Sequence, residues 1–502
     1  MSTARRVWRT PVLALVGVAL AGAVAIDRDR PLATEVAFGA PAAAPMPVAP
    51  AAGVLTSTFY CPGVPSQPDR ESGARTGAIT ILNPGDVPVS GTLTAYPSNS
   101  FEQVAAGEAL PPDPAPGTSV GQSITVPPRQ RLVVPVPVEG LVASDYTAAL
   151  VEMRGGDVVV EQASITASGT RPTPCATTAS DTWYTADGST TTDADLRFLA
   201  FNPFPEDAIV DFTFATNEGT REPQALRGYV IPARSLRAVR LTDEVLRKTT
   251  ISASVVTRSG RVVLGRFQTF DNSAGRQGVI TGLAAPAAGR DWFFADGEKG
   301  EGVSERFAIF NPSDDDAEVT VLLYPGEGAA AIDPINDTVP PKTTKIINIT
   351  EAESVPDGRH LSIVTSENGV PIVVERVLDT TAEGRRGTTS VFGARLFSTR
   401  WYLAAGAGDD ATEYLTVGNP TGEATTFAVK AIGPAGATPV IGLEAVPLGP
   451  AGTTQLNLSD VGLRNAALVI DGAGPIIAER SFYTPERAGA TAIMGVPVVE
   501  PG

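Results

Sequence analysis

The chain has 502 residues, including 50 glycines and 43 prolines, and only 19% of its side chains are charged. This length exceeds what one hydrophobic core normally serves and allows about three to five domains. Its formal charge is −17, from 38 Lys and Arg against 55 Asp and Glu, and no basic stripe occurs along it. The composition therefore disfavours nucleic acid and anionic lipid surfaces as partners and favours strand-and-turn modules.

Residues 1–30 predict a signal peptide or an N-terminal membrane anchor. Three arginines precede an apolar run from Pro11 to Ile26, and Ala23-Val24-Ala25 offers small residues for cleavage. The run is slightly shorter than the about 20 residues of a spanning helix. A cleaved signal is favoured and an uncleaved anchor stays open. Either way we expect export to the extracytoplasmic cell envelope, as a secreted or membrane-anchored protein.

Residues 31–53 are rich in Ala and Pro, so we expect an extended tether rather than part of a core. The C-terminal stretch "GVPVVEPG" has no apolar tail or lipidation motif. Any attachment to a membrane is therefore expected through the N-terminal segment only.

A repeat dominates the rest of the chain. The motif W-x-x-A-x-G occurs three times, with separations of 292 − 183 = 109 and 401 − 292 = 109 residues, and an Asn-Pro follows it after 19, 19 and 18 residues. A proline-flanked polar turn, a glycine turn and a strand carrying Arg then follow in the same order. These landmarks predict a tandem repeat. Its markers are Trp183, Trp292, Trp401, Asn202, Asn311 and Asn419.

A fourth, divergent copy precedes these three. Phe59 takes the place of the tryptophan, Asn83-Pro84 supplies the Asn-Pro, and an additional stretch runs from Ser98 to Val120. The sequence therefore predicts four modules after the tether. They are module 1 (54–180), module 2 (181–289), module 3 (290–398) and module 4 (399–502).

Within the modules the hydrophobic period is two. In "AIVDFTFAT", Val210, Phe212 and Phe214 alternate with polar or small residues, as in a half-buried strand. About seven or eight such strands per module, with no amphipathic helix, predict an all-β protein of immunoglobulin-like antiparallel β-sandwiches. A propeller-like arrangement is the alternative, although a blade normally holds four strands.

The repeated aromatic and charged residues favour structural roles. A tryptophan at the same place in each repeat is more typical of a core or module junction than of an exposed platform for sugar rings. The repeated arginines, Arg266, Arg376 and Arg480, follow Gly265, Glu375 and Glu479 directly. Neighbours on a strand point to opposite faces, so each arginine is expected to pack on an aromatic ring or to join modules rather than to pair with its own neighbour.

Cys61 and Cys175 are the only two cysteines, and both lie in module 1. In an exported protein they predict a disulfide, which would close a loop of 175 − 61 = 114 residues. Such a loop is worth about 4 to 5 kcal/mol in the chain-entropy model. A thiol nucleophile has no nearby base in the sequence, and a closed zinc site has too few ligands.

Catalytic and metal residues are not predicted, and neither is a cofactor. His360 is the only histidine, and it has no counterpart in the other modules. Clustered carboxylates favour solubilising hairpin tips, while Ca²⁺ binding and glycoside cleavage stay open as alternatives. These carboxylates are Asp193, Asp195, Asp314, Asp315, Asp316, Asp409 and Asp410.

With its W-[YF]-x-A-x-G, Asn-Pro and proline-turn landmarks, the chain resembles an uncharacterised family of exported actinobacterial proteins. The resemblance implies an envelope location and no established activity. The first hypothesis is a non-enzymatic scaffold or adhesion-type binding protein, whose partner is an envelope protein or cell-wall polysaccharide. The second is a carbohydrate-active protein that binds or cleaves wall polysaccharide through loop carboxylates, with Ser98–Val120 as its distinguishing loop. A regulatory subunit of an envelope enzyme is a third hypothesis.

Overall fold

The computed structural model describes residues 44–51, 53–66, 68–69, 73–74, 76–99, 113–326, 332–408, 410–433, 436–485 and 487–499. These residues belong to one compact unit. The predicted signal or anchor and the first part of the tether lie outside them. Among the described residues no helix has the length and apolar character needed to cross a membrane. The three helices found there are short 3-10 turns, at Gln224–Leu226, Leu241–Asp243 and Leu458–Val461.

Module 1 contains two four-stranded antiparallel sheets and a small hairpin. The first sheet has the order β1 (Thr56–Pro65), β8 (Tyr146–Arg154), β5 (Val89–Pro97), β6 (Val120–Val126). The second has the order β10 (Gly169–Pro174), β9 (Val159–Thr166), β4 (Thr76–Asn83), β7 (Gln130–Val136). The hairpin pairs β2 (Pro68–Asp69) with β3 (Gly73–Ala74).

Module 2 repeats this plan with one additional short strand. Its first sheet has the order β11 (Thr182–Thr185), β17 (Ile251–Ser259), β13 (Ala208–Thr216), β14 (Gly219–Arg221), and β15 (Tyr229–Ile231) also pairs with β13. Its second sheet has the order β16 (Ser235–Arg240), β12 (Ala194–Asn202), β18 (Val263–Ser273), β19 (Arg276–Leu283).

Module 3 has the most regular version of the plan, with two four-stranded sheets. The first has the order β20 (Asp291–Lys299), β25 (Gly358–Ser366), β22 (Ala317–Pro325), β23 (Ile335–Val339). The second has the order β24 (Thr343–Asn348), β21 (Val303–Asn311), β26 (Val373–Ala382), β27 (Arg385–Phe392).

Module 4 differs because one strand of 17 residues, β34 (Ala467–Tyr483), takes part in both halves and joins them into a nine-stranded sheet. One half contains β28 (Ser398–Leu403), β30 (Thr425–Gly433), β31 (Gly436–Pro439), β32 (Val446–Leu448) and β36 (Val496–Pro497). The other half contains β29 (Thr412–Gly418), β33 (Thr453–Asn457) and β35 (Thr491–Met494).

In modules 1 and 2 a separate core lies between the two sheets, whereas most buried apolar residues of modules 3 and 4 belong to one continuous hydrophobic cluster. In module 2 the alternating Val210, Phe212 and Phe214 of β13 are fully buried. The ring of Phe212 lies 6.1 Å from that of Phe198, which comes from β12 in the other sheet. The prediction of an all-β, antiparallel protein is therefore confirmed. The immunoglobulin-like type is not confirmed, because that fold divides its strands as ABED and CFG, whereas module 3 has two sheets of four.

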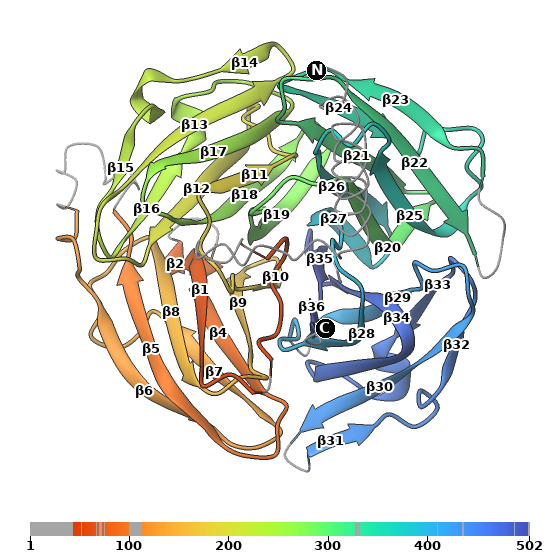
Figure 1. Cartoon of the computed structure of the whole chain (residues 1–502), viewed down its shortest axis with the longest axis horizontal. Helices are drawn as coiled ribbons and strands as arrows, with labels where there is room; N and C mark the ends of the chain where they lie inside the picture. The colour runs from red at the N-terminus through yellow and green to blue at the C-terminus, as the bar shows by residue number, and fades with distance from the viewer. Residues whose placement is uncertain are drawn as a thin grey trace, which may run out of the picture. The chain divides into compact units, whose positions relative to one another are not determined.

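The modules contact one another in a cycle, 1–2–3–4–1 (Figure 1). Ser98 bridges to Leu236 between modules 1 and 2. Ion pairs join modules 2 and 3 and modules 3 and 4, and hydrogen bonds join module 4 back to module 1. A cycle of contacts is what the propeller-like alternative predicts, whereas a module of two facing sheets is what the sandwich prediction requires.

One strand from each module lies at the centre of this cycle. We call β10, β19, β27 and β35 the hub strands. Around the cycle, β10 contacts β19, β19 contacts β27, β27 contacts β35, and β35 contacts β10. Each is the partner of the strand that carries the repeated arginine or its equivalent, so the arginines are delivered next to the hub.

Candidate functional site at the module junctions

The repeated tryptophans lie in the cores of their modules. Trp183, Trp292 and Trp401 are each no more than 1% exposed. Their indole nitrogens donate to the carbonyls of Val262, Ile372 and Ile476 at 2.9, 3.0 and 2.8 Å, which are equivalent positions four residues before the repeated arginine. The indole thereby satisfies its single donor inside the fold. In module 1, Phe59 is 2% exposed and needs no such acceptor.

The repeated asparagines connect two of the sequence landmarks. The Asn311 amide nitrogen donates to the carbonyls of Asp315 at 2.7 Å and Val339 at 2.9 Å, and its oxygen accepts from the Ser313 N–H at 2.9 Å. It thus fastens the hairpin after Asn-Pro to the end of the strand before the proline turn. Asn83, Asn202 and Asn419 make equivalent contacts.

A buried carboxylate joins module 2 to module 3. Glu375 of β26 is fully buried, and one of its oxygens accepts from the backbone N–H groups of Ala186 and Asp187 at 2.9 and 3.3 Å. Its other oxygen pairs with Arg266 at 2.6 Å. The acceptor therefore comes from module 3, while both N–H groups and the guanidinium come from module 2.

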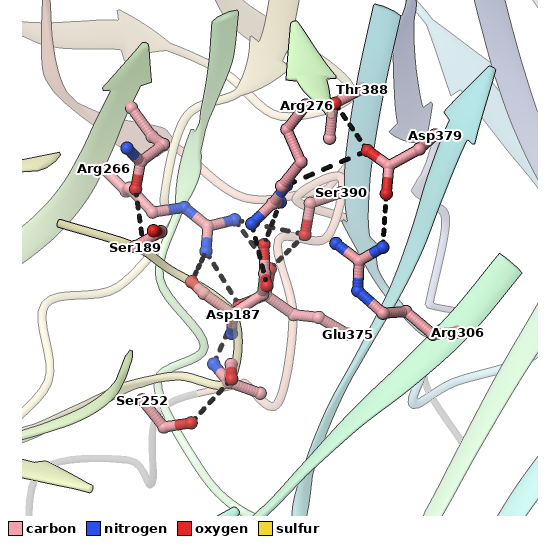
Figure 2. A network of polar contacts seen from close by, with 12 residues as sticks. Asp187, Ser189, Ser252, Arg266, Arg276, Arg306, Glu375, Asp379, Thr388 and Ser390 are labelled. Atoms are coloured by element: carbon pink, nitrogen blue, oxygen red, sulfur yellow. Dashed lines mark hydrogen bonds and ion pairs between the residues drawn. The ribbon is translucent and has the colours of Figure 1, made fainter. Parts of the chain in front are cut away.

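Further charges surround this pair in the network of Figure 2. Arg276 of β19 holds the Asp187 carboxylate at 2.5 Å. Arg306 of module 3 pairs with Asp379, which also accepts from Thr388 at 2.6 Å. Burial raises the pKa of Asp187, but Arg276, Arg306 and Arg266 outweigh it, so the pKa lies below its ordinary value. The carboxylate is thereby kept ionised within the junction.

The junction of modules 3 and 4 repeats the arrangement. One oxygen of Glu479, on β34, accepts from the N–H groups of Ala295 at 2.6 Å and Asp296 at 3.3 Å. Its other oxygen lies 2.8 Å from Arg376. Both charged side chains of this pair are at most 1% exposed. Arg266 and Arg376 thus each reach the glutamate of the following module, which is the junction role that the sequence left open.

At the junction of modules 4 and 1 the carboxylate persists but the ion pair changes. Glu161 of β9 accepts from the N–H groups of Ala404 and Ala405, each at 2.9 Å and each with a separate oxygen. Arg480 pairs instead with Glu413 of its own module. Because Glu161 is buried without a direct cationic partner, its pKa is raised, although the two N–H groups oppose the shift.

The junction of modules 1 and 2 lacks this device on both sides. Gly265 occupies the position of the glutamate, and Pro62 occupies the position of the alanine whose N–H would bind it. A proline has no N–H to donate. A Cβ added to Gly265 would lie 2.8 Å from the Pro62 ring, so the close approach requires glycine. Donor and acceptor are therefore missing together.

Other contacts hold modules 1 and 2 together. Tyr96 and Tyr146 of module 1 pack against Phe201 and Phe267 of module 2, with ring centroids 5.2 and 5.5 Å apart. Both described ends of the Ser98–Val120 stretch also reach module 2. Asn99 accepts from the Ala238 N–H at 2.8 Å and Asp113 pairs with Arg237 at 2.5 Å, whereas residues 100–112 lie outside the described residues.

The cysteine prediction is confirmed, because Cys61 and Cys175 form a disulfide. Both cysteines are buried in the core of module 1. The bond joins the opening strand β1 to the segment just after β10, and so connects a sheet edge to the hub strand. It therefore links the two sheets of module 1 to each other.

His360 lies buried in module 3, 1% exposed, with its Nε2 2.9 Å from a carboxylate oxygen of Glu305. The structure brings no serine or cysteine nucleophile to it among the contacts described. Asp195 pairs with Arg197 and Arg240, each at 2.8 Å.

The remaining described aspartates of the carboxylate clusters lie in turns or bends or directly beside one. Asp314 is an exposed partner of Lys342 at 3.2 Å, and Asp410 lies 3.5 Å from Arg487. Asp409 lies outside the described residues. In the part of the chain that the structure describes, no group of three or more His, Cys, Asp or Glu is placed to hold a metal ion.

A cavity of about 90 Å³ lies at the hub. Its walls include Thr173, Thr281, Val391 and Ile493, one from each of the four hub strands. Trp292 and Phe392 also line it, and Met46 of the predicted tether closes part of it. The tether residues 44–51 are therefore partly packed, contrary to the expectation of a free tether, with Met46 8% and Ala49 2% exposed.

Residues 267–481 match a family of unknown function, DUF5719. No curated protein sequence matches the chain. Among solved structures, the crystal structure of Thermotoga maritima 1070 has 17% identity and a TM-score of 0.20, with 21% of this chain and 94% of that chain covered. A tetra-tandem repeat in the extending region of a large adhesion protein has 11% identity and a TM-score of 0.12, with 87% and 99% covered.

The family match begins in β18 of module 2, includes module 3 and ends in β34 of module 4. It fits the expected resemblance to a family of unknown function. At such TM-scores the two solved structures carry no argument about fold or activity.

Proposed function

We propose that this chain is an exported, non-enzymatic scaffold or binding protein of the cell envelope, which presents its loops from four modules held in fixed relation. Its partner would be an envelope protein or a wall polysaccharide, and it would reach the membrane only through its N-terminal segment. The main support is the use of the repeated charged residues. Glu161, Glu375 and Glu479 all bind backbone N–H groups of the neighbouring module, so they serve assembly.

Two junctions contain a buried carboxylate–guanidinium pair, so the modules are docked against one another and are not independent domains joined only by linkers. An ion pair removed from water is favourable only with good geometry and further hydrogen bonds, and Glu375 has both. Separation of module 2 from module 3 would leave Glu375 and Arg266 without their partners. Adjacent modules are therefore expected to stay docked. Fixed modules hold several loops at constant spacing, which suits multivalent binding.

The carbohydrate-active alternative depends on the one large difference between modules, Ser98–Val120. Asn99 and Asp113, at the two described ends of this stretch, both bind module 2 at the junction that lacks the glutamate. The ends of the Ser98–Val120 stretch therefore help to join modules 1 and 2. The observation favours the scaffold proposal over a catalytic loop.

The test uses residues 44–502 and a variant that lacks residues 100–112 but keeps both docked ends. Each is incubated separately with wall polysaccharide and with solubilised envelope proteins. The proposal expects saturable, specific binding that the deletion leaves unchanged and no release of reducing sugar ends. Time-dependent release of reducing ends, lost in the deletion variant, would instead establish the carbohydrate-active alternative. Absence of specific binding to both fractions would contradict the scaffold proposal.

A further inference from the structure

The junction of modules 4 and 1 differs from the other three in its covalent connection. Successive modules are joined by the polypeptide, whereas modules 4 and 1 lie at opposite ends of the repeat array. Their contacts include Glu161 and a pair of hydrogen bonds from Arg131 to Asn465 at 2.5 and 3.1 Å. The segment 44–51, which precedes module 1, lies at this junction.

One end of this segment touches both modules. The Ala49 N–H donates to the carbonyl of Pro497 at 2.9 Å, and Ala49 forms a parallel bridge with Val498 at the end of module 4. One residue on, the carbonyl of Pro50 accepts from the N–H of Asp157 in module 1, also at 2.9 Å. Two successive residues thus bond the last strand of the array and a turn of its first module.

The packing around Ala49 continues across the junction. Ala49 belongs to a buried cluster that contains Leu82 and Val159 of module 1 together with Tyr402 and Val469 of module 4. The Tyr402 hydroxyl also donates to Asp157 at 2.9 Å. The segment is therefore part of the hydrophobic contact that joins the two modules.

The turn of module 1 is shaped for this segment. A Cβ added to Gly156 would lie 1.9 Å from the carbonyl oxygen of Ala51, well inside any tolerated contact. Only glycine allows the backbone of the segment to approach so closely. The close approach of residues 44–51 is therefore the structural reason for a glycine at position 156.

The other end of the segment enters the hub. Met46 is 8% exposed and lines the hub cavity with Trp292 and Phe392 of module 3 and with Ile493 of module 4. Its sulfur accepts from the Arg395 N–H at 3.5 Å. A flexible thioether suits an irregular space built from several modules.

We propose that residues 44–51 form a clasp that closes the cycle of modules, with Met46 as the plug of the hub cavity and Ala49-Pro50 as the bridge between modules 4 and 1. The hub cavity is thus partly covered by a segment of the chain itself. Release of the clasp opens the junction of modules 4 and 1 first and exposes the apolar hub. This inference is independent of the proposed partner.

The test compares the full chain with its Met46→Asp and Met46→Ala variants by hydrogen exchange. The Met46→Asp variant places a charge in the apolar hub, and the Met46→Ala variant removes only the plug. Gly53→Asp is the matched control, because it adds the same charge at an exposed position with no atom near its Cβ. The reporters are the Ala404 and Ala405 amides at the 4–1 junction and the Ala295 and Asp296 amides at the 3–4 junction.

We expect exchange at Ala404 and Ala405 to accelerate about tenfold or more in both Met46 variants, while exchange at Ala295 and Asp296 and in the control stays unchanged. Equal acceleration at both junctions would overturn the proposal, because Met46 would then be an ordinary core residue. Unchanged exchange at Ala404 and Ala405 in both variants would also overturn it, since the junction would be closed without the clasp.

Discussion

The glutamates at the module junctions carry the sharpest consequences at the scale of single residues. Each is buried and uses its oxygens for backbone N–H groups of another module, and Glu375 additionally neutralises Arg266. The chain therefore places carboxyl and guanidinium groups where a hydrophobic contact would otherwise be expected. Such groups are costly to leave unpaired.

Replacing Glu375 with alanine should lower the free energy of unfolding by about 3 to 5 kcal/mol, because Arg266 would stay buried without its counter-charge. Denaturant unfolding measures the effect. The control is Asp86→Ala, which breaks an exposed pair with Arg129 and should cost no more than about 1 kcal/mol. Equal small losses in both variants would show that the junction pair contributes little.

The lowered pKa of Asp187 predicts a pH dependence. A carboxyl whose pKa is lower in the folded than in the unfolded protein stabilises the fold fully above its unfolded value, which is about 4. This contribution is lost as the pH falls through the folded pKa. Stability measured between pH 7 and pH 2 should therefore decline less steeply in Asp187→Asn than in the unaltered protein. Parallel curves would contradict the assignment.

At the scale of elements, the repeated asparagine, which ends β4, β12 and β21 and directly follows β29, fastens a hairpin to a proline turn. The Asn311→Ala variant should lose about 1 to 3 kcal/mol of stability, because the buried carbonyl of Val339 and the part-buried carbonyl of Asp315 would lose their donor. Asn217→Ala removes the same group at an exposed turn and serves as control. Thermal or chemical unfolding of the two variants measures the loss of stability in each. Indistinguishable losses in the two variants would argue against the fastening role.

Much of this element structure was predictable from sequence. The period of two in "AIVDFTFAT" identified β13, and the repeat landmarks placed Trp183 and Asn202 at equivalent positions. Both signals are local, so one chain suffices to find them. The strand order within each module was not predictable, because which strands pair depends on long-range contacts that the hydrophobic period does not encode.

The junction pairs were partly within reach of the sequence. Glu375-Arg376 and Glu479-Arg480 recur as neighbours that point to opposite faces, which excluded an ion pair between each arginine and the glutamate directly before it. A further signal in the sequence was the coupled change in which Gly265 replaces the acceptor glutamate and Pro62 replaces the alanine that donates its N–H. Nothing in the sequence indicated that Met46 lies at the hub, because the surrounding Ala and Pro residues predicted an extended tether.

At the scale of the whole molecule, the junctions predict cooperative unfolding. The disulfide between Cys61 and Cys175 closes a loop with a sequence separation of 114 residues in module 1. Replacing both cysteines with alanine should cost about 5 kcal/mol in the chain-entropy model. Because module 1 is docked to modules 2 and 4, we expect one calorimetric transition that moves to lower temperature. A separate early transition for module 1 would contradict this interlocking.

A cycle of modules also restricts how many repeats the chain can contain. A linear array can gain or lose a unit at its end with little effect on the others. In this chain the removal of one module would bring together faces that do not match, such as the Gly265 face of module 2 and the Ala404-Ala405 face of module 4. Insertion of a fifth copy would require every remaining interface to adopt a new angle. Repeat number is therefore a property of the closed assembly, and copy-number change should be tolerated far less here than in rod-like surface proteins.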